Sequence, residues 1–186
     1  MSSSRKRRRL AIFLAAEGGL GIIALALGAL SGAPPLATLG PVGSGTAQGG
    51  LAALPMLALL SLLWRSPSES LHRIRERLEE TLSSLFGRSG RVELALVSLA
   101  AGVGEEMLFR GWLQAWLGEN IGILPALAVA SLVFGLAHPM TAVYVVLASV
   151  FGAYLGIIWL ATGNLVVPIV AHAVYDFVAL TTVVRR

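Results

Sequence analysis

Two adjacent glutamates and an arginine lie in the middle of an otherwise apolar stretch of the sequence. Glu106 is followed four residues later by Arg110, which places both on one helical face in the order that favours an ion pair. Glu105 points about 100° away from that face and has no basic residue one turn further along. Charge inside a membrane is costly and usually marks a functional site. We therefore take this cluster as the centre of a candidate site.

Two histidines and an aspartate provide further side chains that can carry chemistry. His138 follows Phe134 by four residues at the end of an apolar segment, which alone is typical of an interfacial residue. His172 lies within the last apolar segment, with Asp176 one turn further on the same face. A carboxylate beside a histidine fixes its tautomer and raises its basicity, for metal binding or proton transfer.

Together these residue types are suited to hydrolysis by an activated water. Glu105 or Glu106 could deprotonate the water, and the histidines could stabilise the oxyanion and protonate the leaving amine. Alternatively, two histidines and a carboxylate are a recognised catalytic zinc set, with the fourth position open for water, although the spacing here is not His-Glu-x-x-His. The chain has no cysteine, which excludes a thiolate zinc site and a cysteine nucleophile.

The composition requires that membrane-spanning helices hold these residues. The chain is 56% hydrophobic and 13% charged, whereas soluble domains have about 25% charged residues. Several nearly uncharged apolar stretches are long enough to cross a bilayer. We expect an all-α, polytopic helical membrane protein with about six transmembrane helices and one cytoplasmic amphipathic surface helix. The predicted spans are 10–30, 49–64, 92–117, 121–137, 141–161 and 165–184.

We expect a single integral membrane domain over 1–186, because the spans can bury their polar faces only against one another. Its parts are a basic cytoplasmic tail (1–9), an amphipathic linker helix (66–88) and a motif-bearing catalytic core (92–184). The stretch 32–50 is rich in Gly, Pro, Ser and Thr and is predicted to be a loop.

The linker helix carries start and stop signals. Ser66 offers an N-cap, Pro67 the first helical position and Glu69 a capping-box carboxylate, while Gly87 can end the helix. Its leucines recur at helical spacing, so it either lies on the membrane surface or packs on the core as a solvated helix.

The distribution of basic residues predicts the topology. With a cytoplasmic amino terminus, six spans place every Lys and Arg except Arg110 in the cytoplasm, in agreement with the positive-inside rule. We therefore interpret the basic tail as a topology signal, with no nucleic-acid partner. The first apolar run is longer than that of a signal peptide, so we expect it to be retained. We expect a prokaryotic cytoplasmic (inner) membrane protein with both termini cytoplasmic.

Glu17 is a further carboxylate within the first predicted span. We interpret it as a group near the cytoplasmic third of the span that reaches water or pairs with a neighbour. A part in the functional site is the alternative.

Three ordered motifs resemble those of the CPBP intramembrane proteases. They are Glu105-Glu106-x-x-x-Arg110, Phe134-x-x-x-His138 and His172-x-x-x-Asp176, on successive apolar segments within 92–184. That family takes in the type II CAAX prenyl endopeptidases and the bacterial Abi group of bacteriocin-processing or self-immunity proteins. The resemblance implies a water-activating role for Glu105, with Glu106 and Arg110 as its partners. It also implies catalytic or metal-ligand positions at His138 and His172, with Asp176 supporting His172.

We accordingly expect an intramembrane endopeptidase, of metallo- or glutamic type, that cleaves a membrane-associated protein or peptide. Zinc or another divalent metal at Glu105, His138 and His172 is the possible cofactor, and the lipid bilayer is the surrounding partner. The CAAX endopeptidases have asparagine at the position of Asp176, so a prenylated substrate is not assumed. The alternative is a non-enzymatic immunity factor or complex subunit that binds a peptide through the same polar cluster. A proton-coupled carrier is disfavoured because no repeated halves are visible.

Overall fold

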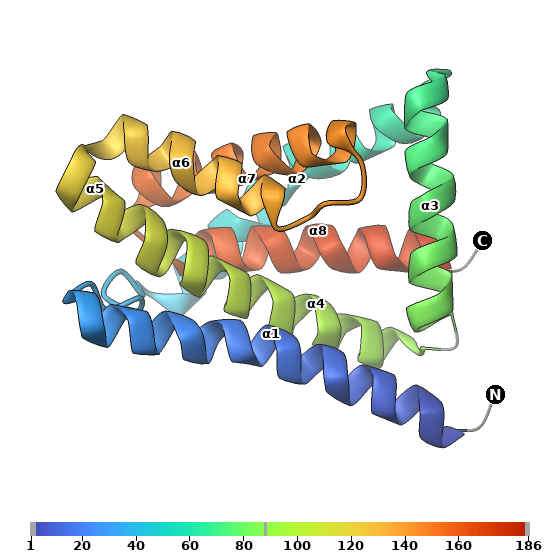
Figure 1. The fold of residues 1–186 in the computed structure, drawn as a ribbon, viewed down its shortest axis with the longest axis horizontal. Coiled ribbons are helices and arrows are strands. Elements are labelled where there is room, and N and C mark those ends of the chain that lie inside the picture. The colour runs from blue at the N-terminus through green and yellow to red at the C-terminus, as the bar shows by residue number, and fades with distance from the viewer. Residues whose placement is uncertain (1–2, 88, 185–186) are drawn as a thin grey trace.

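The computed structural model describes residues 3–87 and 89–184, and these form a bundle of helices without strands (Figure 1). Arg88, Arg185 and Arg186, which the topology prediction counts among the cytoplasmic bases, lie outside the described residues. The helices are α1 (Ser3–Ser31), α2 (Val42–Arg65), α3 (Glu69–Phe86), α4 (Arg91–Glu106), the π-helical segment η1 (Met107–Gln114), α5 (Ala115–Ile121), α6 (Ile123–Leu136), α7 (Ala142–Thr162) and α8 (Val166–Val184).

Four helices in the described part of the chain are long and apolar enough to cross a membrane: α1 from Arg7 onward, α2, α7 and α8. Helix α6 is apolar but has only 14 residues, which corresponds to about 21 Å against a hydrocarbon core of about 30 Å. The segment that carries the two glutamates continues as α4, η1 and α5 without a break. The prediction of an all-α, polytopic membrane protein is confirmed.

Helix α8 occupies the centre of the bundle, where it packs against α2, α4, α7 and α3 (Figure 1). Helix α1 packs against α4 and η1, and α6 packs against α7 and η1. Because η1 and α8 both lie among other helices, their polar side chains face the protein interior and not lipid. This arrangement brings all three sequence motifs to the centre of the bundle.

Helix α3 lies across one side of the bundle, crosswise to most other helices (Figure 1). The first and last described residues of the chain lie on the same side. It buries Ile74 and Phe86, and Phe86 clusters with Leu94, Val97 and Leu180. Arg75 Nη1 donates to the carbonyl oxygens of the residues that end α2, at 2.9 Å (Leu63), 3.2 Å (Trp64) and 3.0 Å (Ser66). Carbonyls at a helix end have no partner within the helix, so Arg75 fixes α3 to the end of α2.

Two predicted boundaries were wrong. Residues 42–50 belong to α2 and not to a loop, because the glycines at 45 and 49 allow this turn to pack directly on Asn164, Val166 and Val170 of the α7–α8 region. The linker helix begins at Glu69, and its N-cap is Ser68, which makes no side-chain cap hydrogen bond. The hydroxyl of Ser66 instead accepts from the Ser68 amide at 3.3 Å. The predicted end of the helix at Gly87 is confirmed.

Candidate active site

A buried charged group links the end of α4 to η1 and α8. Glu106 Oε1 accepts a hydrogen bond from Arg110 Nη1 at 2.8 Å and lies 2.8 Å from His172 Nδ1. Glu106 is 0% and Arg110 1% exposed. A carboxylate buried to this degree requires charged or hydrogen-bonding partners, and the structure supplies both to Oε1, while Oε2 has no hydrogen-bond partner. The helical pairing of Glu106 with Arg110 that the four-residue spacing predicts is present.

The π-helical turn directs Arg110 toward α7. Arg110 Nη2 donates to the carbonyl oxygen of Gly152 at 2.7 Å, and Gln114 Nε2 donates to that of Gly156 at 3.4 Å. Both glycines lie where a β-carbon would contact neighbouring side chains, the Phe134 ring at Gly152 and Gln114 at Gly156. Glycine at 156 therefore allows η1 to approach α7 closely, and glycine at 152 does the same for α6. Wide helical turns of this kind occur often at functional sites.

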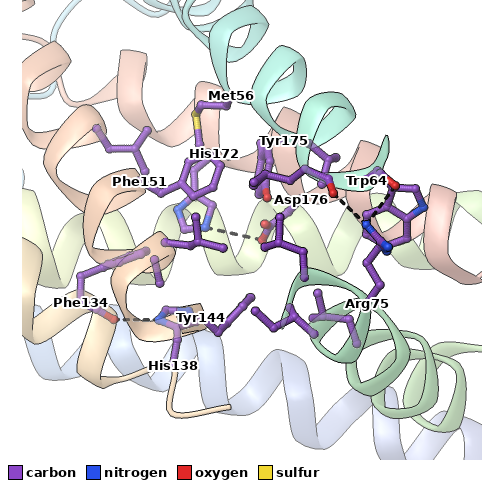
Figure 2. Close-up of a pocket in the computed structure, with 18 residues that line it drawn as sticks. Met56, Trp64, Arg75, Phe134, His138, Tyr144, Phe151, His172, Tyr175 and Asp176 are labelled. Carbon is purple, nitrogen blue, oxygen red and sulfur yellow. Dashed lines mark hydrogen bonds and ion pairs between the residues drawn. The ribbon is translucent and has the colours of Figure 1, made fainter. Parts of the chain in front are cut away.

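His172 is held from two sides. Its Nδ1 faces Glu106, and its Nε2 lies 3.5 Å from Asp176 Oδ2, one turn further along α8 (Figure 2). The same-face arrangement of His172 and Asp176 predicted from their spacing is therefore observed. The two carboxylates fix the plane of the imidazole ring.

Glu105 has a different partner from Glu106. Its Oε2 lies 3.7 Å from His138 Nε2, and this oxygen is buried without a hydrogen-bond partner. His138 Nδ1 lies 2.8 Å from the carbonyl oxygen of Phe134 (Figure 2). Because a carbonyl can only accept, Nδ1 is the donor, and the lone pair of neutral His138 is on Nε2. The basic nitrogen of His138 therefore faces the carboxylate of Glu105.

The Phe134 ring lies among these groups. Its centroid is 4.8 Å from the His138 ring, 6.0 Å from the His172 ring and 4.6 Å from Arg110 Cζ. A cation over an aromatic face is attracted to the ring, so Phe134 shields Arg110 while separating the two histidines. Sequence reasoning used Phe134 only as part of a motif and did not assign it to the site. Its four-residue spacing from His138 was the available signal.

The Glu105–His138 pair and the group of Glu106, Arg110, His172 and Asp176 meet at one partly open cavity of about 580 Å³, here called the large cavity. Glu105, His138, His172 and Asp176 line it, and Glu106 and Arg110 lie behind its wall. Three further residues line it: Tyr144 and Tyr175, which sequence reasoning did not consider, and Glu17, for which a part in the site was the alternative interpretation.

A smaller cavity of about 110 Å³ shares His138, His172 and Asp176 with the large one. Figure 2 shows its residues: Met56 of α2 and Phe151 of α7 lie beside His172, while Arg75 of α3 lies beside Trp64, away from the histidines. Most of its remaining lining is aliphatic. The polar groups are thus placed where the smaller and the larger cavity adjoin.

The predicted metal ligands were tested against this geometry. Glu105 and His138 face each other, but the nitrogens of His172 face Glu106 and Asp176. Among residues 3–87 and 89–184, no group of three or more His, Asp or Glu side chains is arranged to hold a metal ion. The side chains therefore do not fit a metal centre with three protein ligands, and we derive no reaction step through a metal.

Comparison with known proteins identifies the middle and carboxyl-terminal part of the chain. Residues 88–178 match the family model described as type II CAAX prenyl endopeptidase Rce1-like. The matched segment contains all three motifs, and it confirms the family predicted from them. No curated protein and no solved structure matches the chain.

Proposed function

Because residues 88–178 belong to the type II CAAX prenyl endopeptidase Rce1-like family, we propose that this chain is an intramembrane endopeptidase. It hydrolyses a peptide bond of a membrane-associated protein or peptide inside the large cavity, between α1, α4 and α8. The observation that carries this proposal is the Glu105–His138 pair, whose facing atoms lie 3.7 Å apart on the cavity wall.

In this proposal Glu105 is the general base. A water beside the pair donates one hydrogen to Glu105 Oε2 and the other to the lone pair of His138 Nε2. Such a water has its oxygen polarised toward the scissile carbonyl carbon. Glu105 takes the proton as the oxygen attacks, and it returns that proton to the amine nitrogen as the C–N bond breaks. The buried Oε2 has no hydrogen-bond partner within the chain, which leaves it available for this water.

The buried group around His172 has an electrostatic role in this proposal and transfers no protons. Its members are Glu106, Arg110, His172 and Asp176. With Nδ1 directed at Glu106 and Nε2 at Asp176, His172 is suited to the imidazolium form. Arg110 and His172 then balance Glu106 and Asp176, so the buried group is neutral as a whole. The His172 charge borders the cavity, where it stabilises the oxyanion that forms during attack. Preorganised charges of this kind act strongly in a water-poor site.

The glutamic and metal-dependent mechanisms differ in their response to chelation. The geometry favours the glutamic type, so activity should persist after treatment with 1,10-phenanthroline, and the purified protein should contain less than one equivalent of metal by elemental analysis. Loss of activity on chelation with recovery on addition of Zn²⁺ would contradict the glutamic mechanism and leave the endopeptidase assignment intact.

The assignment as an endopeptidase is tested by reconstitution. The purified full chain in phosphatidylcholine vesicles is incubated with a library of quenched peptides that carry an apolar anchor, and new termini are identified by mass spectrometry. We expect cleavage by the wild-type chain and its loss in Glu105→Gln. Glu80→Gln, an exposed carboxylate on α3, is the matched control and should retain cleavage.

The same experiment separates the enzyme from a non-enzymatic peptide-binding protein. A binding protein would show peptide association in the vesicles without new termini, and Glu105→Gln would leave that association unchanged because the amide nearly preserves the shape of the side chain. That result would overturn the proposed function.

A further inference from the structure

Glu17 reaches the proposed site from a helix that lies outside the three motifs and outside the segment 88–178. Helix α1 approaches α4 closely at this level because residue 104 is a glycine. A β-carbon at Gly104 would overlap the carbonyl oxygen of Glu17. The backbone of Glu17 is therefore placed directly against the turn that carries Glu105.

The Glu17 side chain is directed into the large cavity, whose wall it shares with Glu105 and Asp176. Its Oε2 is buried and has no hydrogen-bond partner. Glu105, Asp176 and His172 line the same cavity and act on Glu17 electrostatically. Two of these three are carboxylates, so Glu17 shares the cavity mainly with groups of its own sign of charge.

Among the described residues, His172 acts on Glu17 with opposite charge, but it is already paired with two other carboxylates. Among the residues that the structure describes, no Lys or Arg lines the large cavity. The nitrogens of His172 face Glu106 and Asp176, while those of His138 face Phe134 and Glu105. A desolvated carboxylate requires a compensating partner, and a cavity of about 580 Å³ is within the size range of ligand pockets.

We propose that Glu17 is a specificity-determining residue that binds a basic side chain of the substrate, Lys or Arg, close to the peptide bond that is cleaved. This inference rests on the proposed endopeptidase function. Since Glu17 and Glu105 line the same cavity, a cation bound at Glu17 holds the adjacent peptide bond beside Glu105. Pairing of opposite charges at a partly desolvated site contributes specificity more than catalytic rate.

The test uses the full chain in phosphatidylcholine vesicles and two matched series of quenched, anchored peptides. At each position in turn, one series carries Lys and the other norleucine, a neutral side chain of similar length. We expect the wild type to favour Lys at one position by about tenfold or more in kcat/KM, as for one hydrogen bond between charged groups. In Glu17→Gln the ratio should fall to about one, mainly through KM.

Charge reversal provides the second variant. Glu17→Lys should shift the preference at the same position from Lys toward Glu, which a merely structural role for Glu17 would not produce. The matched control, Glu80→Gln, should keep the wild-type ratio. Thermal unfolding of each variant in detergent shows which of them are folded.

The outcomes separate this inference from the proposed function. Equal kcat/KM for the Lys and norleucine peptides at every position in the wild type would overturn the role of Glu17 and leave the endopeptidase intact. An equal loss for both series in Glu17→Gln would also overturn it, because Glu17 would then act on catalysis or folding. Absence of any cleavage by the folded wild type would overturn the proposed function, and this inference with it.

Discussion

His172 on α8 and Glu106 at the end of α4 are joined through Nδ1 and Oε1, which lie 2.8 Å apart in a position that is almost completely closed to solvent. The same oxygen accepts from Arg110 Nη1 at 2.8 Å. One oxygen of Glu106 therefore connects α4 to α8, although the two bonded residues are 66 positions apart in the sequence. Removal of Glu106 leaves Arg110 without a carboxylate, and removal of Arg110 or His172 leaves Glu106 with one cationic partner in place of two.

Replacement of Arg110 should destabilise the protein strongly. In Arg110→Met the Glu106 carboxylate stays buried and keeps His172 but loses its arginine, so the buried group carries an uncompensated negative charge, and breaking a buried ion pair in this way costs about 3–5 kcal/mol. The measurement is chemical unfolding in detergent, followed by the fluorescence of the tryptophans. Arg73→Met is the matched control, since Arg73 forms an exposed pair with Glu69 at 2.7 Å and should change stability by less than about 0.5 kcal/mol. Equal effects of the two changes would contradict the buried network.

The two adjacent glutamates should separate into a catalytic and a structural role. Glu105→Gln removes the proposed base but no ion pair with an arginine, so kcat should fall by about 10²- to 10⁴-fold with little loss of stability. Glu106→Gln leaves Arg110 buried and unpaired, so its unfolding free energy should fall by about 3–5 kcal/mol. Parallel measurement of kcat in vesicles and unfolding in detergent distinguishes them. Retention of full activity in Glu105→Gln would contradict its assignment as the base.

The pairwise relationships within the site were accessible to sequence reasoning, because they depend on helical spacing. The distance of four residues is enough to place Glu106 beside Arg110, and His172 beside Asp176. The spacing also showed that Glu105 needed a different partner, since no base lay one turn away. That partner, His138, comes from a separate helix end, and only the family resemblance connected it to the glutamates.

Other parts of the site depend on contacts that cannot be predicted from the local sequence. The Gly152 carbonyl that accepts from Arg110 is a backbone group, and every residue has one. The position of Glu17 on the cavity follows from the approach of α1 to Gly104, a long-range packing relationship. The helical turn at 42–50 is rich in glycine, which favours a loop when tertiary packing is not considered.

The contact between α3 and α2 should determine the local stability of α3, a helix that lines both cavities. Leu78 of α3 lines both cavities, and Arg75 fixes the helix through three carbonyl oxygens. Arg75→Ala should increase amide hydrogen exchange in residues 69–86 by about tenfold or more, as expected for loss of hydrogen bonds to a charged group. Arg73→Ala, on the exposed side of the same helix, is the control. Unchanged exchange in Arg75→Ala would show that apolar packing alone holds α3.

The close approach of α1 to α4 predicts opposite effects for two glycine-to-alanine changes. Gly104→Ala adds a β-carbon that would overlap the Glu17 carbonyl oxygen, so the two backbones must separate at a cost of about 1–3 kcal/mol. Gly18→Ala, at the residue directly after Glu17 in α1, has nothing within 4 Å and should stabilise the helix by about 0.5–1 kcal/mol. Chemical unfolding in detergent measures both. If Gly104→Ala proved as stable as the wild type, α1 would not press against α4 at Glu17, and the placement of this carboxylate beside Glu105 would be wrong.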